Sequence, residues 1–275
     1  MTQAIVRVSW APLRREPRHA SEMVSQVLLG EVLELADPPD SSRPPTDWAF
    51  ARCPDAYEGF VTHGSLHTCG PDEAAGWAAR ADLTSLGTGL VALDTESLTP
   101  RHAPFGARVA SGSPGVVELP DGSRANPSDP GSVISDLDRA GRYPPNPAAI
   151  VLTAGQWLGA PYVWGGRTEQ GADCSGFVQA VLGLHGFPLP RDSRDQFKGG
   201  SRAASADVQR ESIAGDLWFF AWEGRPVSHV GICLGGARMV HSSETRGCVA
   251  IDALGEGDFG RRLLEGLVGF VRPAR

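Results

Sequence analysis

A cysteine at the expected start of a helix is the residue of this sequence best placed to act as a nucleophile. Cys174 follows a glycine-rich segment, and Asp173 before it would be the N-cap of the helix. The apolar residues after it recur at the spacing of one buried helical face: Phe177, Val178, Val181 and Leu182. The unpaired N–H groups in the first turn of a helix lower the pKa of a thiol and can bind an oxyanion.

A nucleophilic thiol at this position needs a base, because the negative charge of Asp173 would raise the pKa of its neighbour. His229 begins a segment, 229–234, in which apolar residues alternate as in a half-buried strand. Cys174 and His229 together would form an activated nucleophile and its base. The other cysteines are expected to be structural: Cys53, Cys69, Cys233 and Cys248.

A second histidine follows in what the pattern predicts to be a hairpin. Residues 235–237, Gly-Gly-Ala, form the expected turn as a three-residue loop, which pairs Leu234 with Arg238. In that register His229 and His241 share one face of the hairpin, whereas a two-residue loop would place them on opposite faces. His241 would then orient the ring of His229.

The sequence as a whole describes a chain of more than one domain with no obvious polyanionic partner. It has 275 residues and a net charge of −7, from 25 Lys and Arg against 32 Asp and Glu. The absence of a strongly basic window argues against nucleic acid or an anionic membrane as the partner. The N-terminus lacks the pattern of a signal peptide, and no apolar run approaches the length of about 18 residues that spans a membrane. The number of cysteines is odd, which disfavours a full disulfide framework. These features favour a cytoplasmic protein.

The two halves of the chain differ in their patterns. Short β-like runs separated by turns indicate small barrels or sandwiches in the first half, at 5–8, 32–35, 48–51 and 59–61. A second β-like block opens at Leu90. A linker follows at 143–147, where Asn146 and Pro147 form the cap and first residue of a helix expected to reach Leu158.

Five ordered motifs in the second half resemble the NlpC/P60 family of bacterial cell-wall cysteine peptidases. They begin at these residues: Tyr162 (Tyr-Val-Trp-Gly-Gly), Asp173 (Asp-Cys-Ser-Gly-Phe), Gly215 (Gly-Asp-Leu-Trp-Phe-Phe), Ser228 (Ser-His-Val-Gly-Ile) and Met239 (Met-Val-His-Ser-Ser). The resemblance covers residues 146–275 and implies a papain-like α+β domain at 143–275. It implies a triad of Cys174, His229 and His241, with the hydroxyl of Tyr162 near the oxyanion. It implies no metal and no organic cofactor.

The first half resembles bacterial SH3 (SH3b) domains. The first block, 1–70, carries the better match through the segments starting at Leu13, Leu29 and Ala56, and the second block, 71–142, is degenerate. The resemblances together predict a multidomain chain: two small all-β SH3-like barrels followed by the α+β papain-like catalytic domain.

Family members that pair two SH3b domains with the catalytic domain resemble γ-D-glutamyl-L-diamino acid endopeptidases, which act on murein peptides with a free N-terminal L-Ala. In them the first SH3b domain reaches over the cleft, so we expect its residues and the catalytic domain to bind the ammonium together. A carboxylate is the natural partner for an ammonium. The resemblance assigns substrate contacts to these residues: Glu16, Tyr57, Trp164, Asp173, Ser175, Arg191, Asp192 and Ser193.

Three functions remain open at this point. The first is recycling of murein peptides, which fits the absence of an export signal. The second is a peptidoglycan-remodelling hydrolase that acts on the intact wall and is targeted by its SH3b domains. The third is a non-catalytic wall-binding adaptor, which the intact set of Cys174, His229 and His241 disfavours. The sequence specifies neither the diamino acid nor an oligomeric state.

Overall fold

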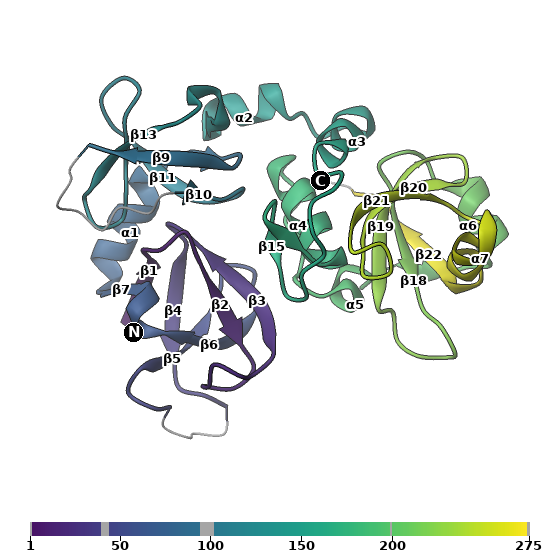
Figure 1. Cartoon of the computed structure of the whole chain (residues 1–275), viewed down its shortest axis with the longest axis horizontal. Coiled ribbons are helices and arrows are strands. Elements are labelled where there is room, and N and C mark those ends of the chain that lie inside the picture. The colour runs from purple at the N-terminus through teal and green to yellow at the C-terminus, as the bar shows by residue number, and fades with distance from the viewer. Residues whose placement is uncertain (1, 40–43, 94–101, 199, 274–275) are drawn as a thin grey trace. The chain divides into compact units, whose positions relative to one another are not determined.

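The computed structural model of the chain describes residues 2–39, 44–93, 102–198 and 200–273. They fall into two compact units, Met1–Asp138 and Arg139–Arg275, which we describe separately (Figure 1). Within the described ranges, no helix has both the length and the apolar character needed to cross a bilayer.

An antiparallel sheet of seven strands opens the first unit. Its strands are β1 (Thr2–Val6), β2 (Trp10–Arg14), β3 (Met23–Leu28), β4 (Val32–Ala36), β5 (Trp48–Arg52), β6 (Glu58–Thr62) and β7 (Leu66–Cys69). They pair in the order β3-β2-β6-β5-β4-β1-β7, and the one-turn 3-10 helix η1 (His63–Ser65) precedes β7. Alternate residues such as Ala4, Leu13 and Val61 are fully buried and form its core.

A second sheet repeats this topology. Its strands are β8 (Leu83–Ser85), β9 (Thr88–Ala92), β10 (His102–Ala103), β11 (Arg108–Ser111), β12 (Val117–Glu118), β13 (Arg124–Pro127) and β14 (Val133–Ser135). The order β10-β9-β13-β12-β11-β8-β14 is that of the first sheet shifted by seven strands, and a 3-10 helix, η2 (Pro130–Ser132), again precedes the last strand. Two blocks without close sequence similarity therefore share one topology. The two closed barrels expected from the sequence are not confirmed, because the pairing ends at edge strands in both sheets.

Helix α1 (Pro71–Arg80) packs against both sheets of the first unit (Figure 1). The side chain of Trp77 is buried between Ile5 of β1 and Ala110 of β11, and its Nε1 donates to the carbonyl of Gly30 at 2.8 Å. The backbone N–H of Arg108 donates to Leu29, whose side chain belongs to the core of the second sheet. The blocks 1–70 and 71–142 thus share buried residues.

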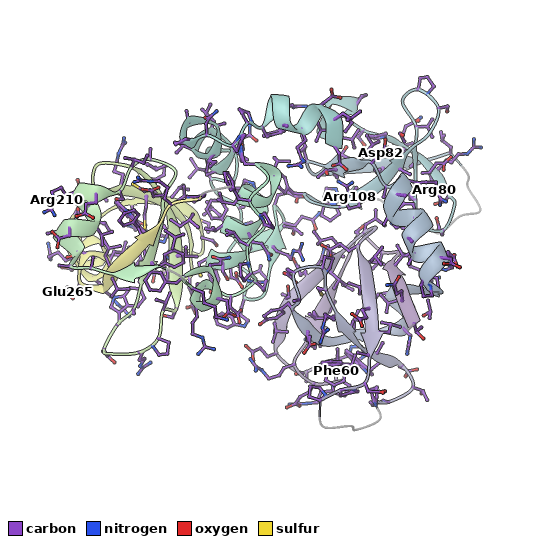
Figure 2. All side chains as sticks on the ribbon, turned by 180° about the vertical axis from the view of Figure 1, so that it is seen from behind. Phe60, Arg80, Asp82, Arg108, Arg210 and Glu265 are labelled. Atoms are coloured by element: carbon purple, nitrogen blue, oxygen red, sulfur yellow. The ribbon has the colours of Figure 1, made fainter. Side chains whose placement is uncertain are left out.

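Charged side chains form a cluster at the second sheet, near the C-terminal end of α1. The guanidinium of Arg108 pairs with Asp136 at 2.6 Å, and Asp82 accepts from the backbone and hydroxyl of Ser111. Figure 2 labels Arg108 and Asp82 in this region. Asp136 begins α2 (Asp136–Arg142), and the division between the two compact units, at 138/139, falls within this helix.

The second unit is an α+β domain built on a six-stranded antiparallel sheet. Its elements are α3 (Pro147–Gly155), β15 (Arg167–Thr168), β16 (Gly171–Ala172), α4 (Cys174–Leu184), α5 (Ser193–Gln196), β17 (Ser201–Arg202), α6 (Ser205–Glu211), β18 (Leu217–Phe220), β19 (His229–Gly235), β20 (Arg238–Ser243), β21 (Cys248–Ala253), α7 (Gly257–Gly266) and β22 (Leu267–Val271). The strand order is β17-β22-β18-β19-β20-β21. Helix α4 packs on β19 and β20, and α6 packs on β22 and α7 (Figure 1).

The helix starts expected from the sequence are confirmed, and one helix end is wrong. The side chains of Asn146 and Asp173 cap α3 and α4 by accepting from the backbone N–H of the third residue onward. Helix α3 ends at Gly155, three residues before Leu158. The next three residues continue in turns whose hydrogen bonds join each N–H to the carbonyl three residues before it.

The contact between Gly30 and Arg108 should be a measurable source of stability in the first unit. Gly30 has a φ of +79°, and a Cβ added there would lie 1.9 Å from the carbonyl oxygen of Arg108. Gly122 has the same φ of +79° but nothing within 4 Å, so it is the matched control. We expect Gly122→Ala to cost about 1 kcal/mol from backbone strain alone, and Gly30→Ala about 3 kcal/mol or more. Urea unfolding measures both, and equal losses would contradict the close approach.

Candidate active site

The nucleophile helix begins at Cys174, as the apolar periodicity predicts. Phe177, Val178, Val181 and Leu182 are fully buried and hold α4 against the sheet. The carboxylate of Asp173 accepts from the N–H of Gly176 at 2.8 Å and from the N–H of Gly165 at 2.9 Å. Its two oxygens therefore join the glycine-rich loop to the first turn of α4.

A buried arginine completes this arrangement. The side chain of Arg191 is 2% exposed, and its two terminal nitrogens donate to the two oxygens of Asp173 at 3.0 and 2.6 Å. Arg191 also donates to the hydroxyl of Ser175 and to the carbonyl of Gly166. A bidentate Arg–carboxylate pair of this kind is strong and directional, so it fixes the position of the residue preceding Cys174.

Close packing explains why glycines flank the cysteine. A Cβ on Gly176 would lie 2.1 Å from the carbonyl oxygen of Gly166, and a Cβ on Gly166 would lie 2.3 Å from that of Gly171. The loop and the helix therefore approach backbone to backbone. Any side chain at these two positions would push the loop away from the thiol of Cys174.

The surroundings of Cys174 favour the protonated form of its thiol. Burial, and after it the charge of Asp173, raise its pKa to about 12 against the opposing effects of the backbone N–H of Val230, the charge of Arg191 and the N–H of Ser175. The N–H of Ser175 in the first turn lowers this pKa, as expected, but the net shift is upward because burial outweighs it. A base is therefore required to generate the thiolate.

Two groups from other elements lie beside the thiol. The backbone N–H of Val230, which follows His229 on β19, donates to the sulfur of Cys174. Tyr162 is half-buried, and its pKa is raised first by burial and next by Cys174, which puts its hydroxyl in the electrostatic environment of the thiol. The sulfur thus lies next to β19 and the Tyr162 loop. Hydrogen-bond reach between Cys174 and the ring of His229 stays a prediction.

The two histidines share one face of the hairpin, as expected, but the turn differs from the prediction. Gly235 pairs with Arg238, so the turn has two residues, and a bulge at Leu234 shifts the register by one. The bulge restores the pairing in which His229 and His241 lie on one face. Nε2 of His229 and Nδ1 of His241 are 2.7 Å apart.

The ring of His229 is held neutral by its surroundings. Phe220 and Trp222 lie against it with ring centroids 5.5 and 6.5 Å away. Burial, and after it the neighbouring His241, lower the pKa of His229 well below the usual histidine value. If the ring of His229 reaches the thiol of Cys174, as predicted, the two would act as a general-base pair rather than a preformed ion pair.

Sequence reasoning missed a carboxylate that continues this chain of hydrogen bonds. Oδ2 of Asp252 lies 3.0 Å from Nε2 of His241, and Arg246 pairs with the same carboxylate. The side chains of His241 and Asp252 are 0% and 6% exposed. A lone Asp in the otherwise uncharged strand Cys248–Ala253, directly after the histidine hairpin, was the available signal.

Three residues that the sequence assigns to the substrate have other partners in this structure. Arg191, Asp173 and Ser175 are buried and hydrogen-bonded to one another, so their side chains position α4. Their assignment to the substrate stays a prediction. Trp164, in the loop before the cysteine, is 60% exposed.

The remaining substrate candidates have placements compatible with the prediction but not a test of it. Asp192 is the N-cap residue of α5 and is half-buried, and the side chain of Ser193 is buried. In the first unit, Glu16 is exposed and pairs with Arg18 at 2.6 Å, while Tyr57 packs partly against the first core. Among the described residues, no group of three or more His, Cys, Asp or Glu is arranged to hold a metal ion.

Comparison with known families finds one match in each half of the chain. Residues 159–268 match the NlpC/P60 family, and residues 13–66 match the bacterial dipeptidyl-peptidase Sh3 domain. The chain therefore carries an NlpC/P60 domain preceded by a bacterial SH3 domain. The match to the Sh3 domain ends before β8. The likeness of the second sheet to the first is therefore supported by its strand order alone.

Individual proteins give the same picture. The chain is 40% identical over 116 residues to the γ-D-glutamyl-L-lysine dipeptidyl-peptidase of Bacillus subtilis, and 38% identical over 111 residues to that of Bacillus cereus. These alignments cover 42% and 39% of this chain but only 38% and 32% of the relatives, so the chain matches about a third of their length. A crystal structure of an NlpC/P60 family protein from Bacillus cereus has the same fold, with a TM-score of 0.81, 21% identity, and coverage of 99% of this chain and 100% of that one.

The site should depend on His229 for the reactivity of Cys174. Because the thiol pKa is raised to about 12, the unassisted thiolate fraction at pH 7 is very small. We expect His229→Ala to slow carbamidomethylation of Cys174 by iodoacetamide about 100-fold, the scale of general-base assistance. Peptide mapping by mass spectrometry reads the rate, with the half-buried Cys248 as the internal control. Equal labelling of Cys174 in both proteins would show that His229 is not its base.

Proposed function

We propose that this chain is a cysteine peptidase that hydrolyses the amide bond between γ-D-Glu and a diamino acid in murein peptides. The observation that carries the proposal is the thiol of Cys174 at the start of α4, beside the strand that begins with His229, with His241 hydrogen-bonded to that histidine. The similarity to γ-D-glutamyl-L-lysine dipeptidyl-peptidases supplies the substrate class.

The first half of the reaction is acylation. His229 takes the thiol proton at Nδ1 as the sulfur of Cys174 attacks the γ-carbonyl carbon of D-Glu. The N–H of Cys174 and the hydroxyl of Tyr162 stabilise the oxyanion that forms. The C–N bond then breaks, His229 gives its proton to the leaving amine, and the diamino acid departs from a thioester.

The second half is hydrolysis of the thioester. His229, neutral again, takes a proton from a water molecule that attacks the same carbonyl carbon. The C–S bond breaks, and the sulfur regains the proton from His229. The γ-carboxylate of the L-Ala–D-Glu product leaves, and the site returns to the protonated thiol and neutral imidazole.

A free N-terminal amine on the substrate is the finer part of the proposal. The matched SH3 model is described for bacterial dipeptidyl-peptidases, and residues 13–66 include Glu16 and Tyr57. A dipeptidyl-peptidase counts two residues from a free N-terminus, so its site must recognise an ammonium. We assign that role to Glu16, Tyr57, Asp192 and Ser193, and we infer that the chain recycles peptides already released from the glycan.

A wall-remodelling hydrolase is the second candidate. The chain is also 39% identical over 99 residues to a bifunctional muramidase/DL-endopeptidase of Bacillus subtilis, an alignment that covers 35% of this chain and 29% of that protein. An enzyme that cuts the intact wall would accept stem peptides whose L-Ala amine is blocked by the glycan. The state of that amine therefore separates the two candidates.

The free-amine requirement is tested with peptides of the form L-Ala-γ-D-Glu-diamino acid, with and without an N-acetyl group. We expect cleavage of the free peptide only, and we expect Glu16→Ala and Asp192→Ala each to lower kcat/KM about tenfold or more. A charge-assisted hydrogen bond to an ammonium contributes about 1.5–3 kcal/mol, which corresponds to that loss. Mass spectrometry of the products identifies the bond that breaks.

Cys174→Ala is the negative control and should yield no product. Cleavage of acetylated peptides or intact peptidoglycan at the rate of the free peptide would replace the recycling role by wall remodelling. Product from Cys174→Ala, in a preparation free of other peptidases, would remove the cysteine mechanism altogether.

The pH profile should report the depressed pKa of His229. The base works only when neutral, and its pKa lies well below the usual value because of burial and the adjacent His241. Activity is therefore retained as the pH falls past about 6.5, where an ordinary histidine becomes protonated, and is lost only at lower pH. A plot of kcat/KM against pH gives the midpoint of the acid limb. A midpoint above that of an ordinary histidine would contradict the neutral resting pair.

A further inference from the structure

The chain of hydrogen bonds behind His229 ends on a buried carboxylate that the proposed reaction does not yet use. It runs from His229 to His241 at 2.7 Å and from His241 to Asp252 at 3.0 Å. Arg246 holds the carboxylate from the other side and stacks over Phe259 with its guanidinium carbon 5.1 Å from the ring. These side chains come from β19, β20, β21 and the turn between the last two strands.

We propose that Asp252 is a positioning residue that fixes which nitrogen of each histidine carries the hydrogen. The inference rests on the proposed role of Cys174 and His229. It concerns the direction of two hydrogen bonds, the one from His229 to His241 and the one from His241 to Asp252. An ionised carboxylate can only accept, so Nε2 of His241 carries a hydrogen and donates it to Oδ2 of Asp252. If His241 carries this single ring hydrogen, as the proposal requires, its Nδ1 is an acceptor.

The tautomer of His241 in turn determines the tautomer of His229. Since Nδ1 of His241 accepts, Nε2 of His229 must carry the hydrogen of that 2.7 Å contact. The lone pair of His229 then lies on Nδ1, the other nitrogen of its ring, where it can take the thiol proton. Reversing the two tautomers would put a hydrogen on Nδ1 of His229 and leave Cys174 without a base.

The surroundings of Asp252 favour the ionised, accepting form. Its hydrogen bond with His241, and after it the one with Arg246, lower the pKa of Asp252 against the opposing effect of burial. The same carboxylate also stabilises the positive charge that reaches His229 when it takes the proton, because successive hydrogen bonds connect it to both rings.

The structure offers a matched control in the same domain. Asp216 is 1% exposed and pairs with Arg272, a half-exposed arginine, as Asp252 pairs with the half-exposed Arg246. Its hydrogen bonds go to Arg272 and to the backbone of Ile213, and they involve no histidine. Asp216→Asn therefore removes a buried, arginine-paired charge without changing the histidines.

The test uses ¹⁵N NMR of the histidine rings, the rate of alkylation of Cys174 by iodoacetamide, and peptide hydrolysis. In the wild type, both His229 and His241 should show a hydrogen on Nε2 and a lone pair on Nδ1. An amide can donate as well as accept, so Asp252→Asn should mix the tautomers, slow alkylation about tenfold, and lower kcat about tenfold with KM within about twofold. Asp216→Asn should leave the tautomers and both rates at wild-type values.

Three results would overturn the proposal: a hydrogen on Nδ1 of His229 in the resting wild type, wild-type tautomers and alkylation in Asp252→Asn, or the same losses in Asp216→Asn. The wild-type spectrum decides the question even if Asp252→Asn does not fold. Alkylation and NMR need no murein peptide, so failure of the relay is distinguishable from a wrong substrate.

Discussion

The carboxylate of Asp173 is the group on which the rest of the site depends. It accepts from the glycine-rich loop, from the first turn of α4 and from Arg191, so one side chain joins three segments around Cys174. Its charge also raises the pKa of the thiol, and Arg191 partly offsets this effect. Removing Arg191 would leave a buried, unpaired carboxylate, a change that costs about 3–5 kcal/mol in other proteins. One buried ion pair therefore holds the segments around the nucleophile and, together with burial, sets the pKa of its thiol.

As a consequence of this arrangement, the thiol of Cys174 needs a base to ionise. Burial and Asp173 keep Cys174 protonated, while burial and His241 keep His229 neutral. Both shifts favour a thiol–imidazole pair over a preformed ion pair. Hydrogen-bond direction then matters more than charge, because a neutral imidazole accepts at one nitrogen only. The sequence of contacts from His229 through His241 to Asp252 gives that direction a structural origin.

The sequence predicted the local features well and the non-local ones poorly. The start of α4, its cap and its buried face follow from residue spacing within one helix, and all were correct. The loop between β19 and β20 was wrong because a bulge at Leu234 depends on hydrogen bonding across two strands, although the shared face of His229 and His241 was correct. Asp252 was missed because its approach to His241 depends on the register of a third strand. The burial of Arg191 and its pairing with Asp173 were not visible in a motif. In the first unit, β2, β3 and β7 were missed, and only the structure shows that the two sheets share one strand order.

Covalent trapping of the nucleophile is the most direct measurement of the central claim, that Cys174 attacks the γ-carbonyl of D-Glu in these peptides. The reagent is L-Ala-γ-D-Glu with a diazomethyl ketone in place of the scissile amide, and the readout is the intact mass followed by peptide mapping. The account predicts one adduct per chain, located on Cys174, absent from Cys174→Ala and reduced by competing substrate peptide. An adduct on another residue, or labelling of Cys174 that competing peptide does not reduce, would contradict it.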